Sequence, residues 1–171
     1  MKAAKIENIN PTLCGEHRNV FLVCGTNDLR VSEKPVINEL VSKMIGKIKQ
    51  IRLLNPNSNI FVVPVLPTRD RAMNRNIILY NSRLLSWIKS NSHIDKSIIM
   101  PPVYSFLDSS GLLASRLTRD GDSIHLGSVG MSRFVSMIKS LVYKHLDFGK
   151  SSNVRRQYTP PTNRAGSTKP A

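Results

Sequence analysis

The stretch NVFLVCGTND, residues 19–28, decides the fold class of this 171-residue chain. Five of its first six residues are apolar, and it ends in Gly25, Thr26, Asn27 and Asp28. A short, nearly continuous apolar run that leads into turn residues is typical of a strand buried on both faces, as in a parallel sheet. We therefore predict a strand over residues 19–24, followed at once by a tight turn.

Further strands and helices alternate along the chain after this strand. Two more apolar runs, over residues 60–66 and 97–100, predict strands, although Pro64 weakens the first of them because it cannot donate to a sheet ladder. Helices are predicted between the strands and after the last one. This alternation predicts an α/β fold with a parallel sheet.

Apolar residues at helical spacing define the three predicted helices. The first runs over residues 35–54, the second lies around Ile77–Ile88 with either Tyr80 or Asn81 completing its face, and Ser128 can cap the third. The apolar positions of the first are Ile37, Leu40, Val41, Met44, Ile45, Ile48 and Ile51, and those of the third are Met131, Phe134, Val135, Ile138, Leu141 and Val142. These faces are expected to cover the sheet.

Basic residues outnumber acidic ones by 25 to 11, so the chain carries a net charge of +14. Residues 148–171 are rich in Pro, Ser, Thr and Asn, and we expect them to form a disordered basic tail with five of these charges. Removing the tail leaves 20 basic and 11 acidic residues, a net +9, on a lead-in at 1–18 and an α/β domain at 19–147. A basic body can attract RNA or another polyanion, but 6% aromatic residues give little support to a base-stacking platform.

The sequence also bears on membrane insertion, cellular location and metal binding. No run approaches the roughly 18 apolar residues that a membrane span needs, and no signal peptide is visible, so we expect a cytoplasmic or nuclear protein. Cys14 and Cys24 are too few for a disulfide scaffold or a four-ligand zinc site. No metal and no cofactor are therefore expected.

Two segments contain candidate catalytic residues. Asn27 follows the first strand, where functional residues gather in parallel sheets, and its amide can donate to an oxyanion, while Gly25 permits the tight exit. Asp122 lies three residues before His125, so its carboxylate can hold the imidazole Nδ1 and leave Nε2 as a general base. Taken alone, the first segment can also be an ordinary strand-to-helix turn. In the second, Asp122 can be a turn residue and His125 a surface histidine.

Together, the two segments resemble the SGNH (GDSL-type) hydrolase superfamily over residues 19 to about 145. The resemblance implies a three-layer, flavodoxin-like fold and an esterase that acts on small ester or acetyl substrates. It assigns Asn27 and Gly25 to the oxyanion hole, and Asp122 and His125 to the acid and base of a Ser-His-Asp triad. Leu126, Ser128, Gly130 and Met131 also resemble the family's entry into its last helix.

The chain departs from the family at the nucleophile. The family's serine lies in a Gly-Asp-Ser segment after the first strand, and no such segment precedes residue 19; the tripeptide at 121–123 follows polar residues rather than a strand. We therefore expect an N-terminally truncated chain that lacks the first strand-helix unit and its nucleophile, and that is inactive as written. The alternative is a non-catalytic SGNH-like module that binds RNA or another polyanion.

Two further groups are weaker candidates. Cys24 is interpreted as a core residue rather than a nucleophile. Arg69, Asp70, Arg71 and Arg75 follow the second strand, where they could hold an anionic substrate or form local ion pairs.

Overall fold

A computed structural model of the chain describes residues 5–15, 17–30, 37–92 and 95–145. Its sheet has three parallel strands in the order β1-β2-β3, formed by Asn19–Leu22, Asn59–Val62 and Ile98–Ile99. β1 and β2 are in register, with Val20 opposite Ile60. The predicted α/β class with a parallel sheet is confirmed.

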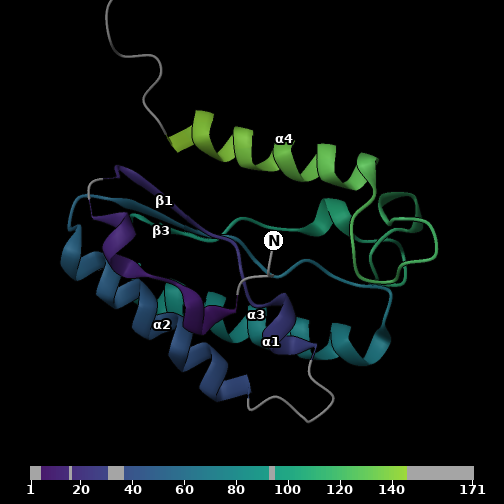
Figure 1. Cartoon of the computed structure of the whole chain (residues 1–171), viewed down its shortest axis with the longest axis horizontal. Coiled ribbons are helices and arrows are strands. Elements are labelled where there is room, and N and C mark those ends of the chain that lie inside the picture. The colour runs from purple at the N-terminus through teal and green to yellow at the C-terminus, as the bar shows by residue number, and fades with distance from the viewer. Residues whose placement is uncertain (1–4, 16, 31–36, 93–94, 146–171) are drawn as a thin grey trace, which may run out of the picture.

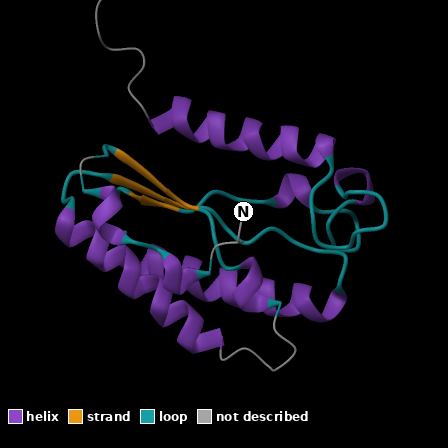
Figure 2. Cartoon of the chain, in the orientation of Figure 1, coloured by secondary structure: helices purple, strands orange, loops and turns teal. Residues whose placement is uncertain are grey.

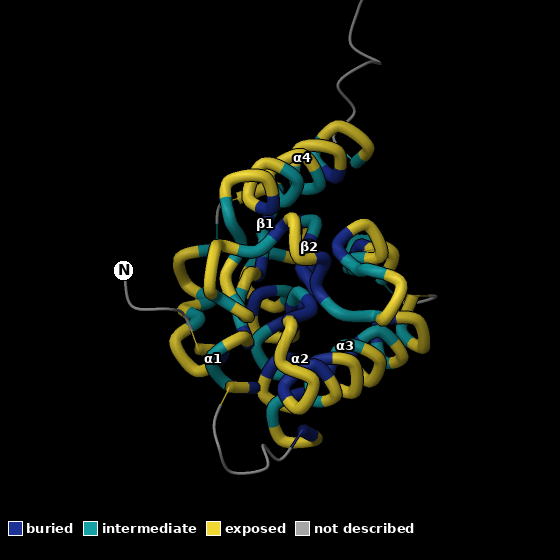
Figure 3. Tube along the Cα trace, turned by 90° about the vertical axis from the view of Figure 1, so that its right-hand side faces the viewer, coloured by how far each residue is buried: buried dark blue, intermediate teal, exposed yellow. Residues whose placement is uncertain are grey.

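Helices cover both faces of this sheet. α2 (Ile37–Leu54) and α3 (Arg71–Asn91) pack against one face, while α4 (Ser128–His145) lies across the other (Figure 1). The view turned by 90° shows the same three layers (Figure 3). A one-turn helix, α1 (Thr26–Leu29), follows β1 directly.

The strands and the last helix differ slightly from their predicted bounds. β1 ends at Leu22 and β2 at Val62, so Pro64 lies beyond the ladder that it could not have continued. α4 begins at Ser128 itself, whereas we predicted this residue as the cap before the helix. The predicted helix and strand types are unaffected.

The main core lies between the sheet and the pair α2 and α3. Its members from α2 are Ile37, Val41, Met44, Ile48 and Ile51, as the sequence period predicted. Tyr80, rather than Asn81, completes the buried face of α3, whereas the Asn81 amide bonds both the N–H and the carbonyl of Val65. Ile6, in the short 3₁₀ helix Ile6–Asn8, is fully buried in this core, which the sequence did not predict.

The opposite layer is less completely covered. Phe21 stacks on Phe61 with ring centroids 4.5 Å apart, and His145 of α4 lies edge-on to Phe61. Met131 and Val135 of α4, which we predicted to face the core, are 51% and 43% exposed. The described part of the chain contains no element that packs over these two side chains.

Two expectations concern the ends of the chain and the membrane. The predicted basic tail at 148–171 lies outside the described residues. No helix among the described residues is long and apolar enough to span a membrane.

Candidate active site

The loops that follow the strands gather at one edge of the sheet (Figure 2). Because all three strands are parallel, their carboxyl ends meet there, which is where ligands bind in open α/β sheets. The loop at 118–127 before α4 reaches the same edge and carries the predicted acid and base.

Asp122 and His125 are hydrogen-bonded to each other. Asp122 Oδ2 lies 2.6 Å from His125 Nδ1, while its Oδ1 accepts the backbone N–H groups of Ile124 and His125 at 2.7 and 3.0 Å. These backbone hydrogen bonds, followed by the bond to the imidazole, hold the pKa of Asp122 well below its usual range. An ionised Asp122 favours a proton on Nδ1, and Nε2 of His125 then carries a free lone pair.

The backbone of this loop is fixed at several points. Arg119 N–H donates to the His125 carbonyl at 3.0 Å, and Thr118 forms an isolated antiparallel bridge with Leu126. Arg69 N–H, from the loop after β2, donates to the Ser123 carbonyl at 2.8 Å. The catalytic candidates are therefore held both by bonds within their own loop and by a bond to the loop after β2.

The turn after β1 is built around Gly25. Its φ of +107° lies in the left-handed region that favours glycine, and a Cβ there would lie 3.0 Å from Cγ2 of Val65. Gly25 is the N-cap of α1, which holds half-buried Asn27 in its first turn. The Asn27 amide has no hydrogen-bond partner among the described residues.

A pocket of about 430 Å³ joins this turn to the histidine. Cys24 and Thr26, on either side of Gly25, line it together with His125, Ile124 and Met131. Asn27 and Gly25 do not line it. The structure thus brings Cys24, Thr26 and His125 into one pocket, while Asn27 follows Thr26 in the chain without lining the pocket.

Cys24 is a poor nucleophile despite its place in this pocket. Burial, assisted by the negative charge of Asp28, raises the pKa of its thiol to about 12. Asp28 Oδ2 in turn accepts the backbone N–H of Ile6 at 3.1 Å, which anchors the N-terminal segment on α1. The interpretation of Cys24 as a core residue therefore agrees with its surroundings.

The basic cluster after β2 forms structural contacts. Arg69 Nη1 donates to the Leu113 carbonyl at 2.9 Å and lies 3.4 Å from Oδ2 of Asp108, while Asp70 caps α3. Sequence reasoning missed the role of Arg69 in joining three loops, because its partners lie about 40 or more residues away. No group of His, Cys, Asp or Glu within the described ranges could hold a metal ion.

Similar folds occur among solved structures of hydrolases. A GDSL-like lipase from Bacteroides thetaiotaomicron aligns with a TM-score of 0.62 at 17% identity, covering 75% of this chain and 63% of the lipase. A protein provisionally described as an acylhydrolase, from Bacteroides fragilis, aligns with a TM-score of 0.60 at 17% identity over 74% of this chain and 62% of its own. The fold is that of the SGNH (GDSL-type) hydrolases.

A third solved structure is more similar in sequence and less similar in fold. This protein, provisionally described as a platelet activating factor from Streptococcus pneumonia, shares 23% identity at a TM-score of 0.55, over 75% of this chain and 61% of its own. The chain spans less than two thirds of the length of each of these three structures. No protein-family model matches the sequence, and no curated protein matches it.

Proposed function

We propose that this protein is a hydrolase of the SGNH type that cleaves small ester or acetyl substrates, with His125 as the general base and Asp122 as its partner. The observation that carries the proposal is the 2.6 Å contact between Asp122 Oδ2 and His125 Nδ1 at the lip of a pocket on the carboxyl edge of a parallel sheet. A carboxylate that holds Nδ1–H stabilises the imidazolium formed when Nε2 takes a proton from a hydroxyl nucleophile.

The oxyanion formed by the attack needs hydrogen-bond donors. We assign this role to the Asn27 amide and to the backbone N–H of Gly25, since the α1 N-cap Gly25 and the α1 residue Asn27 flank the pocket-lining residue Thr26. Asn27 must turn toward the pocket to donate, and catalytic hydrogen bonds often tighten only when substrate is bound. Loss of one such donor costs on the order of a hundredfold or more in kcat.

No serine among the described residues lines the His125 pocket, so the nucleophilic serine of the proposed triad must come from elsewhere. β1 pairs with β2 along one edge, and among the described strands none pairs with its other edge. β1 runs directly into the pocket, and Val23 at its end is 53% exposed. A strand paired along this edge would end beside His125, so we assign the nucleophile to a hydroxyl on such a strand.

The test is hydrolysis of p-nitrophenyl butyrate by two proteins: the 171-residue chain, and the product of the coding sequence extended upstream of Met1. The extended form should turn over with a burst of p-nitrophenol from an acyl-enzyme, while the 171-residue chain shows only slow activation of water. In the extended form His125→Ala should lower kcat by at least a thousandfold, and Asn27→Ala by about a hundredfold.

His17→Ala is the matched control, because His17 is also an exposed histidine but lies outside the pocket. It should leave the rate unchanged. An upstream sequence without a strand and a Gly-Asp-Ser segment would contradict the proposal, as would equal rates for His125→Ala and the unmodified protein.

A further inference from the structure

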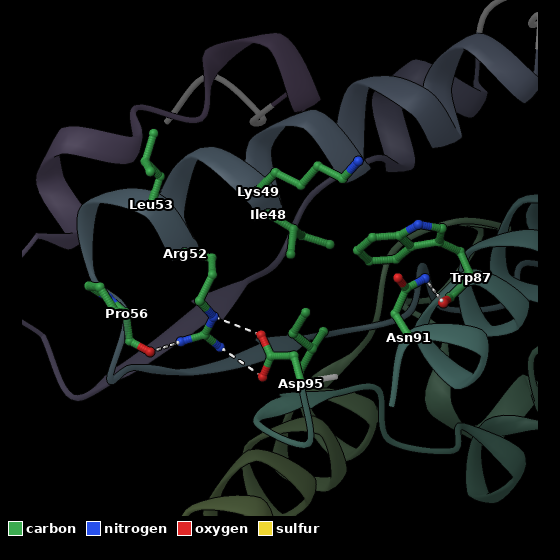
Figure 4. A pocket seen from close by; sticks show the side chains of 9 residues that line it. Ile48, Lys49, Arg52, Leu53, Pro56, Trp87, Asn91 and Asp95 are labelled. Atoms are coloured by element: carbon green, nitrogen blue, oxygen red, sulfur yellow. Dashed lines mark hydrogen bonds and ion pairs between the residues drawn. The ribbon is translucent and has the colours of Figure 1, made fainter. Parts of the chain in front are cut away.

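A second pocket lies at the opposite end of the sheet from His125. This groove, of about 410 Å³, lies between the C-terminal halves of α2 and α3 (Figure 4). Ile98 of β3 also lines it. Its lining shares no residue with the His125 pocket. Its volume lies within the range of sites for small organic ligands.

One aromatic ring forms the α3 side of the groove. Trp87 is half-buried, and Ile48 and Leu53 of α2 line the groove with it (Figure 4). Apolar walls around an indole suit a flat ring that can stack on it, and a nucleobase is such a ring. Among the described residues that line the groove, Trp87 supplies the one aromatic ring, so we expect these residues to stack one base rather than a run of bases.

The charged residues of the groove differ in their availability. Arg52 is fully engaged, since its guanidinium donates to both oxygens of Asp95, to Ser97 Oγ and to three backbone carbonyls. Asp95 is thereby neutralised. Lys49 is exposed, and its side chain extends from α2 toward the α3 side of the groove (Figure 4). The groove therefore presents one available positive charge beside an aromatic surface.

Asn91 adds a hydrogen-bond acceptor. Its Nδ2 donates to the Trp87 carbonyl at 2.8 Å, which fixes the amide beside the ring and leaves Oδ1 to accept. The exocyclic amino group of a stacked base is a donor of the matching kind. The net charge of +14 on the chain adds a field that attracts phosphate to this cation.

We propose that this groove binds one nucleotide unit, with its base stacked on Trp87 and its phosphate on Lys49. The shared chemistry is that of a base linked to a phosphate, whether the unit is a free nucleotide or part of an RNA strand. This site is independent of ester hydrolysis, since it uses none of the residues at the His125 pocket.

Intrinsic fluorescence tests the proposal directly, because Trp87 is the only tryptophan in the 171-residue chain. The chain is titrated with AMP, with UMP, with a short single-stranded RNA and, as base-free controls, with ribose 5-phosphate and inorganic phosphate. Nucleotides should quench the emission in a saturable way, and the base-free phosphates should not. A larger affinity for RNA than for AMP would identify the strand as the source of the unit, and equal affinities would identify the free nucleotide.

Variants locate the binding, measured by calorimetry so that Trp87 itself can be replaced. Trp87→Ala should weaken AMP binding by roughly five- to a hundredfold, Trp87→Phe should restore part of it, and Lys49→Ala should weaken it and reduce its salt dependence. Lys43→Ala is the matched control, because Lys43 lies on the same helix but is paired with Glu39 and lies outside the groove. His125→Ala should bind AMP as tightly as the unmodified chain.

Several results would overturn the proposal. Absence of saturable quenching by any nucleotide would do so, as would quenching by inorganic phosphate alone. RNA binding that survives both Trp87→Ala and Lys49→Ala would place the contacts elsewhere on the basic chain and not in this groove. Failure of ester hydrolysis would leave the nucleotide result unchanged, so the two proposals can be judged separately.

Discussion

Alanine at Gly130 should displace the loop that carries His125. Gly130 is buried in the first turn of α4, and a Cβ there would lie 2.2 Å from the carbonyl oxygen of Leu117 and 2.9 Å from Cδ2 of Leu126. The first distance is more than 1 Å short of the 3.4 Å at which ordinary contact begins. Backbone on one side of the contact must therefore move.

The magnitude follows from three contributions. Overpacking of this kind costs about 1–3 kcal/mol. The Leu117 oxygen also accepts the N–H of Gly127 at 2.9 Å, and loss of that hydrogen bond costs about 1 kcal/mol more. The better helix propensity of alanine returns about 0.5–1 kcal/mol. We expect a net loss of about 2–3 kcal/mol in the free energy of unfolding, or a fall in Tm of about 5–10 °C.

The assay is urea unfolding of the Gly130→Ala variant, with Gly46→Ala as its control. Gly46 lies within α2, and a Cβ there would meet nothing within 4 Å, so the same substitution should stabilise the protein by about 0.5–1 kcal/mol. The two variants should thus change stability in opposite directions. Equal stability of Gly130→Ala and the unmodified chain would refute the close packing of α4 on the Leu117 carbonyl.

Three further perturbations test other parts of the structure. The Tyr80 hydroxyl is buried and has no hydrogen-bond partner among the described residues. Tyr80→Phe should therefore raise the free energy of unfolding by about 1 kcal/mol, seen as a higher urea midpoint with an unchanged m-value. A lower midpoint would mean that the hydroxyl is hydrogen-bonded. Arg52→Ala leaves the largely buried carboxylate of Asp95 without its cation and should lower the free energy of unfolding by about 3 kcal/mol. Arg52→Lys should restore only part of this loss, because lysine lacks the fork of donors. Full recovery by lysine would contradict the hydrogen-bonded geometry. The pKa of Asp122 is lower in the folded chain than in the unfolded one, so its ionised form stabilises the fold above the usual aspartate pKa of about 3.9, and this stabilisation is lost as the pH falls below that value. When the free energy of unfolding is measured against pH, Asp122→Asn should therefore remove part of the rise in stability between about pH 2 and pH 4. A profile that superimposes on that of the unmodified chain would contradict the pairing of Asp122 with His125.

Local patterns in the sequence were sufficient for most of the fold. The apolar run at 19–24 and the helical spacing of Ile37–Ile51 each specify one kind of element, and the structure contains both. The spacing of Asp122 and His125 likewise sets up a contact within one short loop. Contacts of this kind depend on residues that are close in the chain.

Features that depend on distant residues were not predictable in this way. The backbone N–H of buried Ile6 donates to Asp28, 22 residues away, and the backbone N–H of Arg69 donates to Ser123 in the His125 loop. Met131 lies on an apolar helix face yet is half exposed. Helical periodicity identifies apolar positions, but it does not show which elements pack against them. The motif around Asn27 likewise predicts a role for this residue, but it does not show that Thr26 and His125, and not Asn27, line the pocket.

Nuclear magnetic resonance of the His125 imidazole can show whether Asp122 and His125 act as a unit. At neutral pH we expect the proton on Nδ1, with a downfield Hδ1 resonance that disappears in Asp122→Ala. This measurement needs no substrate and no nucleophile, so the 171-residue chain is sufficient. A proton on Nε2, or an Hδ1 signal that is the same in Asp122→Ala, would contradict the claim.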